Sequence, residues 1–255
     1  MNLINVGYKS VNCYALEIGG GYLLIDVGMP GTFGELVPVL QRKSVPLEKV
    51  HFLVVTHFHP DHCSIAQELK NAGVTLLLGD VQERLLAEAN RAPTKFPGYL
   101  PISDLGNTVV GTDSRAAWKA TTGIDGVLLH TPGHSDDSVT VVIDGVGAFV
   151  GDLRPPEAYI GQAAALAEKS WQKISTAGAR KAFPAHGPAF DIEAQSHDPA
   201  VLRGAAAAMR SSFRLRKPRA DPGRREAEGR ERAQRASAEC VNAGPPSPQA
   251  SVPSF

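Results

Sequence analysis

The chain has 255 residues, 43% of them hydrophobic, and its 26 basic and 26 acidic side chains give a formal net charge of zero. This size and composition are typical of a soluble globular protein with one large domain or two small ones. No apolar run is long enough to span a bilayer, and the three scattered cysteines argue against a disulfide framework. Because the N-terminus also lacks the basic and apolar regions of a secretory signal, we expect a cytoplasmic protein with no membrane partner.

The first part of the chain predicts a hairpin followed by alternating helices and strands. Two short apolar runs flank the turn formed by Gly19 to Gly21, which is the pattern of a β-hairpin. Beyond the break at Gly28, the spacing of apolar residues distinguishes helices from buried strands. The elements expected here are strands over 12–18, 22–26, 51–56 and 74–78, and helices over 33–42, 65–72 and 81–89.

Strands dominate the expected elements of the next part of the chain. An irregular segment over 91–103 contains three prolines and separates the two parts. The elements expected after it are strands over 127–130, 139–143, 148–150 and 182–185, and one helix over 161–176. Strands interleaved with helices after a hairpin-rich start predict an α/β protein with stacked sheets flanked by helices.

The composition changes near residue 210. Residues 210–255 carry ten basic and five acidic side chains, few large apolar ones, and many prolines, alanines and serines. Such a segment cannot bury enough apolar surface to offset the entropy of ordering, so we expect a disordered tail there and a folded domain over 1–209. This domain keeps 16 basic and 21 acidic side chains, and its acidity argues against nucleic acid as an obligate partner.

A cluster of metal-ligand side chains follows the apolar strand expected over 51–56. His57, His59 and His62 occur within six residues, together with Asp61. The whole chain has eight histidines, so three in one short run are more than a polar surface turn requires. Imidazole and carboxylate are the groups that hold catalytic divalent metals, and the cluster therefore predicts a metal site.

Three further side chains of the same kinds stand where short apolar runs end in tight loops. They are His134 in TPGHS, Asp152 in FVGD and His186 in FPAHG. A rigid scaffold aims ligands at a common point in this way. With the cluster at 57–62 they make five nitrogen and two carboxylate ligands, which are too many for one tetrahedral metal but suit two metals that share a bridging carboxylate.

The order of these motifs resembles that of the metallo-β-lactamase superfamily, in the branch that includes glyoxalase II, the lactonases and ribonuclease Z. The resemblance covers residues from about 8 to 190 and rests on five motifs. These are LIDVG at 24–28, THFHPDH at 56–62, His134, Asp152 and His186. The resemblance implies the metallo-β-lactamase fold, which is an αββα sandwich of two stacked mixed β-sheets flanked by helices.

The resemblance also implies a role for each residue. The first metal would be held by His57, His59 and His134. The second would be held by Asp61, His62 and His186, and Asp152 would bridge the two metals. Asp26 would orient ligands or loops without binding metal itself. A turn-capping aspartate before Gly28 is the other interpretation of Asp26, and the two roles are compatible.

The identity of the ligands narrows the chemistry within the superfamily. A flavodiiron oxidoreductase would have Glu in place of His59, and a β-lactamase with a cysteine ligand would have Cys in place of Asp152. The nitrogen-rich ligand set favours two Zn²⁺ ions and permits iron or manganese. A water that bridges two such ions loses a proton near neutral pH, so a hydroxide would be the nucleophile.

We therefore expect a binuclear metal-dependent hydrolase that cleaves a small ester, thioester or lactone. A mononuclear iron enzyme similar to the persulfide dioxygenases and a nucleic-acid-processing phosphodiesterase are the alternatives. Asp61 is the candidate proton acceptor. Tyr159 follows Asp152 closely, and it could either hydrogen-bond a substrate oxygen or pack under the next helix. The loops over 91–103 and 153–160 are expected to line the pocket for a small-molecule substrate, and the oligomeric state stays open.

Overall fold

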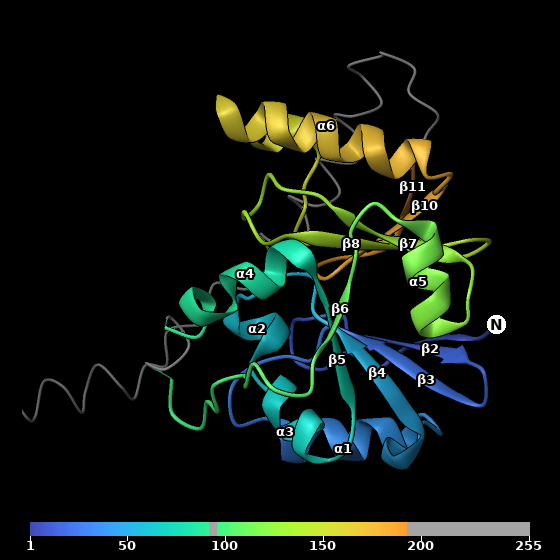
Figure 1. The fold of residues 1–255 in the computed structure, drawn as a ribbon, viewed down its shortest axis with the longest axis vertical. Helices are drawn as coiled ribbons and strands as arrows, with labels where there is room; N and C mark the ends of the chain where they lie inside the picture. The colour runs from blue at the N-terminus through green and yellow to red at the C-terminus, as the bar shows by residue number, and fades with distance from the viewer. Residues whose placement is uncertain (92–95, 193–255) are drawn as a thin grey trace, which may run out of the picture. The chain divides into compact units, whose positions relative to one another are not determined.

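The computed structural model describes residues 1–91 and 96–192. In this part of the chain two β-sheets are stacked face to face, with helices outside both of them (Figure 1). The αββα sandwich expected from the sequence is therefore confirmed. The domain boundary expected at residue 209 and the tail expected over 210–255 lie outside the described residues.

The first sheet is mixed and contains the hairpin expected from the sequence. Its strands, which neighbour one another in chain order, are β1 (Leu3–Asn5), β2 (Tyr14–Ile18), β3 (Gly21–Ile25), β4 (Val50–Val54), β5 (Thr75–Gly79) and β6 (Thr108–Val110). The β2–β3 pair is antiparallel, with Tyr14 opposite Ile25, whereas β3, β4, β5 and β6 run parallel to one another. Because parallel strands end at the same edge of a sheet, the loops after β3 and β4 emerge side by side.

The second sheet is built from the later strands. They are β7 (Gly126–His130), β8 (Val139–Ile143), β9 (Gly147–Gly151), β10 (Lys181–Pro184) and β11 (Phe190–Asp191), in the spatial order β11-β10-β9-β8-β7. Strands β9 and β10 are parallel, and the other neighbours are antiparallel. The loops after β9 and β10 therefore also leave their sheet at one edge.

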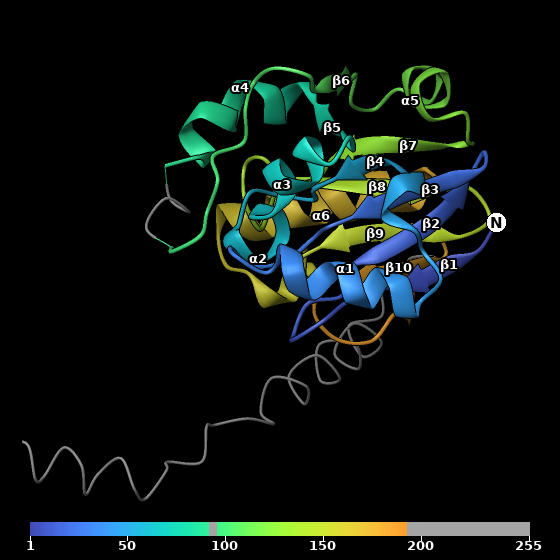
Figure 2. The same ribbon diagram turned by 90° about the horizontal axis from the view of Figure 1, so that it is seen from below.

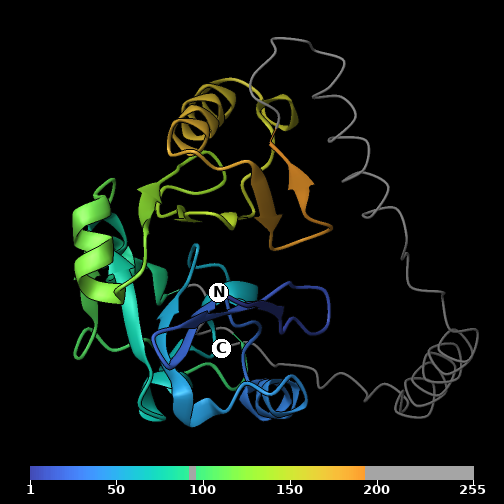
Figure 3. The same ribbon diagram turned by 90° about the vertical axis from the view of Figure 1, so that its right-hand side faces the viewer.

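Helices flank the two stacked sheets. They are α1 (Phe33–Arg42), α2 (Pro60–Cys63), α3 (Ala66–Asn71), α4 (Asp80–Ala89), α5 (Arg115–Thr122) and α6 (Gln162–Thr176), with single 3₁₀ turns η1 (Leu47–Lys49) and η3 (Pro156–Ala158). Seen from below in Figure 2, α1 and α3 lie nearest the viewer and α6 lies behind the sheets; Figure 3 shows the same layers from the side. Within the described ranges, no helix has the length and hydropathy that crossing a membrane requires.

Three apolar clusters hold these layers together. Between the sheets, Leu23 and Ile25 of β3 belong to one cluster with Val141 of β8 and Phe149 of β9. Leu24 points to the opposite face of β3 and belongs to the cluster beneath α1 and α3. A third cluster joins α6 to the outer face of the second sheet. The alternation along β3 follows from the period of two in a strand, and each large buried side chain stabilises the fold by about 1.5–3 kcal/mol.

The sequence missed several short elements, including β1, β6 and α5. Trp118 is the one large apolar residue of α5 and is fully buried, while the rest of the helix is small or polar. A single anchor gives no periodicity to detect. The strand expected over 51–56 ends at Val54, because the backbone N–H of Thr56 binds the carboxylate of Asp26 instead of a neighbouring strand.

Candidate metal centre

Strand β4 delivers the histidine cluster onto the loop that follows it. Helix α2 begins at Pro60, with His59 as the residue before its first turn. Proline is favoured at this position because the N–H that it lacks would have no helical partner anyway. His57 and His62 are buried, whereas Asp61 is only half-buried. The loop and the short helix therefore present two buried imidazoles beneath more open ligands.

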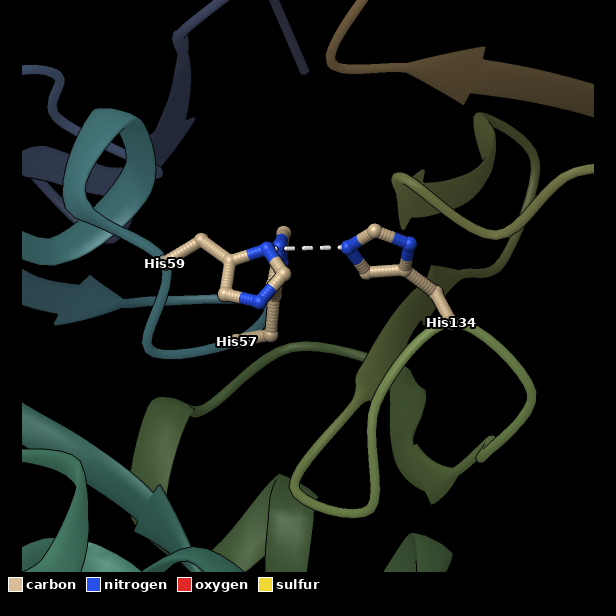
Figure 4. A group of neighbouring side chains, drawn as sticks. All are labelled: His57, His59 and His134. Carbon is tan, nitrogen blue, oxygen red and sulfur yellow. Dashed lines mark hydrogen bonds between the residues drawn. The ribbon is translucent and has the colours of Figure 1, made fainter. Parts of the chain in front are cut away.

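Three imidazoles from both sheets converge in the first group. His57 and His59 come from the loop after β4, and His134 comes from the loop between β7 and β8 (Figure 4). Nδ1 of His59 and Nε2 of His134 are 3.0 Å apart. The three ring centroids form a nearly equilateral triangle with sides of 4.5, 4.6 and 4.8 Å. One ring nitrogen of each residue lies within 4.8 Å of the others.

The second group combines two imidazoles with a carboxylate. Nε2 of His186, on the loop after β10, lies 3.2 Å from Oδ2 of Asp61. Nε2 of His62 lies 3.5 Å from Oδ1 of the same carboxylate. One ligand atom of each residue lies within 4.8 Å of the others. Both carboxylate oxygens of Asp61 thus face a histidine nitrogen.

The carboxylate of Asp152 lies between the two groups. Its Oδ1 is 3.5 Å from Nε2 of His62 and 3.5 Å from Nε2 of His186. Its Oδ2 is 3.8 Å from Nε2 of His134, which belongs to the first group. All seven candidate ligands predicted from the sequence are therefore brought together, and the carboxylate of Asp152 lies close to histidines of both groups.

Several ligand atoms at the centre are buried without a hydrogen-bond partner among the described residues. They are Nε2 of His57, Nε2 of His62 and Oδ1 of Asp152. A buried polar atom left unpaired costs about 1–3 kcal/mol, which a coordinated cation would offset. Nitrogen and carboxylate oxygen together are the donors that zinc, iron and manganese accept. The residues present therefore fit a divalent metal.

Asp26 orients two of the histidines from beneath. Its carboxylate accepts hydrogen bonds from the backbone N of Thr56 at 2.7 Å, from the Thr56 hydroxyl at 2.9 Å and from Nδ1 of His62 at 3.0 Å. Because the hydroxyl proton of Thr56 goes to Asp26, its oxygen accepts from Nδ1 of His57, 3.2 Å away. Both histidines therefore donate through Nδ1 and turn Nε2 toward the centre.

Gly151 is a structural requirement of the site that the sequence did not single out. It has a φ of +56° directly before Asp152. A Cβ at this position would lie 2.4 Å from the hydroxyl oxygen of Thr56 and 2.7 Å from its Cβ. Only glycine permits this close approach, which brings the carboxylate of Asp152 from the second sheet against the histidine loop of the first.

In the metal-free site the electrostatics favour the metal-binding forms of His57 and Asp61, whereas neighbouring carboxylates raise the pKa of His62 and of His186. Burial and the neighbouring imidazoles, His62 first, lower the pKa of His57 well below its usual value, so that His57 is neutral. Burial raises the pKa of Asp61, but the hydrogen bond from His186 and the proximity of His62 outweigh it and lower that pKa to about 2. The same hydrogen bond to Asp61 raises the pKa of His186 to about 9. A neutral His57 and an ionised Asp61 are the forms that bind metal.

Tyr159 contacts the protein backbone beside the site. Its hydroxyl accepts a hydrogen bond from the N of Arg154 at 3.0 Å and donates one to the O of Asp152 at 3.4 Å. Its ring packs against the cluster beneath α6. Of the two roles expected for Tyr159, these contacts match packing under the helix, and they brace the loop that follows Asp152.

Some residues that lie far from the ligands in the chain form hydrogen bonds with the ligand loops, and the sequence did not reveal them. Oδ2 of Asp137 accepts the backbone N–H of Phe58 at 2.6 Å, and the O of Ser10 accepts from Nδ1 of His186 at 2.8 Å. Asn12 binds the backbone on both sides of His186. These partners are 79 to 176 residues apart, so no local pattern could reveal them. Of the expected pocket segments, residues 92–95 lie outside the described residues.

The model of the metallo-beta-lactamase superfamily matches residues 6–186 of the chain. A beta-lactamase-like protein 2 homolog from Drosophila melanogaster is 28% identical over 194 residues, which cover 70% of this chain and 59% of that protein. An N-acyl homoserine lactonase from Bacillus cereus is 25% identical over 166 residues, which cover 56% of this chain and 60% of the lactonase. The chain thus spans 59–60% of the length of these two relatives.

Solved structures resemble this fold at low sequence identity. A metallo-beta-lactamase family protein from Thermus thermophilus has a TM-score of 0.59 and 18% identity, covering 95% of this chain and 83% of that one. A metallo-beta-lactamase from Cronobacter sakazakii has a TM-score of 0.58 and 16% identity, covering 91% of this chain and 94% of that one. At such identities the likeness shows the fold alone.

Proposed function

The chain belongs to the metallo-beta-lactamase superfamily, and on this premise we propose that it is a hydrolase that uses two zinc ions to cleave a small ester, thioester or lactone. The observation that carries the proposal is the convergence of two ligand groups on the carboxylate of Asp152. The N-acyl homoserine lactonase among the relatives supports a lactone as one substrate class.

Two adjoining groups of ligands, linked by a third set made of His57, His62 and Asp152, support a pair of metals. His57, His59 and His134 form one group, and Asp61, His62 and His186 form the other. A pair of zinc ions bound there would lower the pKa of a shared water enough to supply a hydroxide near neutral pH and would polarise the substrate carbonyl. The candidate ligands offer nitrogen and oxygen atoms and no sulfur. Such a ligand set is compatible with zinc ions that also bind an exchangeable water.

The protein's own residues then have distinct tasks. Asp26 and the O of Ser10 hold the Nδ1 protons of His62 and His186, so that Nε2 is the atom of each that would face a metal. The proton that Nε2 of His186 donates to Asp61 would be displaced when a metal binds. Asp61 is the candidate that takes up the proton from the attacking water and passes it to the leaving oxygen or sulfur. While His186 is hydrogen-bonded to it, Asp61 has a low pKa and is a weak base. It would therefore hold the proton only briefly before the leaving group takes it.

A substrate panel tests the proposal. Zinc-loaded protein is assayed against lactones, thioesters, simple esters, a phosphodiester and a chromogenic β-lactam. We expect turnover of at least one of the first three classes, and we expect His59→Ala to abolish it and to lower the metal content. His51→Ala, which changes an exposed histidine on β4 away from the ligands, should leave both unchanged.

Other results would contradict the proposal in specific ways. Turnover of the phosphodiester alone would favour the nucleic-acid-processing alternative. A native content of one iron per chain, with no hydrolysis of any panel member, would favour oxygen chemistry instead. If His59→Ala kept full metal content and full activity, the assignment of the first ligand group would be wrong.

A further inference from the structure

The loop that carries His186 forms hydrogen bonds with a connecting segment of the opposite sheet. His186 follows β10 in the second sheet, whereas residues 6–13 connect β1 and β2 in the first. Figure 3 shows the loop between β10 and β11, in orange, next to the dark blue segment near the N-terminus. The contact between them is a set of hydrogen bonds centred on Asn12.

Asn12 donates to three backbone carbonyls around the histidine. Its backbone N binds the O of Ala185 at 2.7 Å. Its side-chain Nδ2 binds the O of Pro184 at 3.0 Å and the O of Gly187 at 2.7 Å. Both N–H groups of the amide are therefore used, and the carbonyls that they bind lie on either side of His186.

A second asparagine fixes the orientation of this amide. The backbone N of Gly7 donates to Oδ1 of Asn5 at 2.8 Å, so the Asn5 amide must turn its Nδ2 outward. That Nδ2 donates to Oδ1 of Asn12 at 3.0 Å. The oxygen of Asn12 is thereby occupied, and its nitrogen must face the loop of His186. An aspartate at position 12 would instead face two carbonyl oxygens with a carboxylate oxygen, which is repulsive.

The loop has other supports close to the ligand, and one of them, the hydroxyl of Tyr14, donates to the O of Pro184 at 3.1 Å. The backbone N of Ala185 binds the O of Gly151, and Nδ1 of His186 binds the O of Ser10. Gly187 has a φ of +95° and is exposed, so the chain turns sharply directly after the ligand. The imidazole itself is one-third exposed, and its ring centroid lies 5.6 Å from that of His62. Its direction therefore depends on the hydrogen bonds around it as well as on that contact.

We propose that Asn12 is a positioning residue for His186, which holds the loop so that Nε2 faces Asp61 and Asp152 and thereby sets the affinity of the second metal ion. This inference rests on the proposed two-metal function. The first metal ion has no ligand on this loop, so its binding should not depend on Asn12. A purely structural role would not separate the two metal ions in this way.

The test is a zinc titration of metal-free protein by calorimetry with a competing chelator. For Asn12→Ala and Asn12→Asp we expect one ion to bind as in the wild type and the other to bind about 10–100-fold more weakly, the usual effect of losing a residue that orients a ligand. Asn90→Ala is the matched control. Asn90 also joins backbone groups through its amide, at Ile102, but that loop carries no ligand.

The possible outcomes are distinguishable. Unchanged affinities in both Asn12 variants would overturn the inference, and so would an equal loss at both metals, since that is general destabilisation. If Asn12→Ala does not fold, Asn5→Ala leaves Asn12 in place but frees its amide to turn, and the second ion alone should weaken. A wild-type protein that binds a single ion at saturating zinc would contradict the two-metal function itself, without reference to any variant.

Discussion

At the scale of single residues, the site depends on a carboxylate that is not among its metal ligands. Asp26 is buried and has a φ of +59°, a backbone conformation that costs a residue other than glycine about 1–2 kcal/mol. Its three hydrogen bonds to Thr56 and His62 offset this strain. The sequence predicted that Asp26 would orient ligands, but it gave no sign that Thr56 would extend the effect to His57.

Asp26→Asn should weaken metal binding although the new side chain has nearly the same shape as the old one. The new amide would donate toward His62, which would then accept on Nδ1 and carry its proton on Nε2, where a metal must bind. We expect metal affinity to fall about 10–100-fold, measured by competition with a chelator. Asp113→Asn is the control, because Asp113 also has a positive φ of 61° but pairs with Lys173 on the surface. An equal loss of affinity in both variants would contradict this account.

Gly151→Ala should lower stability and metal binding by more than the positive φ of residue 151 alone explains. The new methyl group would collide with Thr56, which holds both Asp26 and His57. Gly145→Ala is the matched control: its φ is +75°, and a Cβ there has nothing within 4 Å. Both variants should lose about 1–2 kcal/mol of stability from the positive φ, and only Gly151→Ala should lose more and also lose metal. Urea unfolding measures the difference, and equal losses would rule out the steric role.

At the scale of elements, the sequence predicted those helices, strands and ligands whose characteristic residues lie within a few positions of one another. The hairpin of β2 and β3 and the helix α1 have their apolar spacing and turn residues within a few positions, and they were predicted closely. The seven candidate ligands were also predicted, because four of them form one cluster after an apolar run and the other three each stand just beyond a short apolar run. Helix α5 and the hold of Asn12 on the loop of His186 were not, because they depend on partners far away in the chain.

Helix α5 should contribute to stability chiefly through one side chain. Trp118 is fully buried in the cluster between the sheets. Trp118→Ala should therefore lower the free energy of unfolding by about 3–5 kcal/mol in urea unfolding of metal-free protein. Lys119→Ala, on the exposed side of the same helix, should change it by no more than about 0.5–1 kcal/mol. Similar losses in the two variants would mean that α5 is not anchored in this way.

At the scale of the whole molecule, the two sheets depend on each other through the site. The first sheet supplies the cluster at 57–62, and the second supplies His134, Asp152 and His186. Neither sheet alone holds a complete ligand set for either group. The cytoplasmic location and the disorder of the tail at 210–255 stay predictions from the sequence.

Metal removal should therefore lower the stability of the sandwich. A metal that binds only the folded protein stabilises it by about 4 kcal/mol when its free concentration is a thousand times its dissociation constant. We expect a chelator to lower the Tm and zinc to restore it. Zinc should raise the Tm of the His186→Ala variant less than that of the His51→Ala variant, which keeps all seven candidate ligands. A Tm that is independent of zinc would mean that metal does not bind the folded site.

The most direct test of the two-metal proposal is elemental analysis of zinc-loaded protein after removal of free metal. The ligand geometry predicts two zinc ions per chain in the wild type and one in His186→Ala, whose first group remains complete. A single metal ion per chain in the wild type, unchanged by His186→Ala, would contradict it.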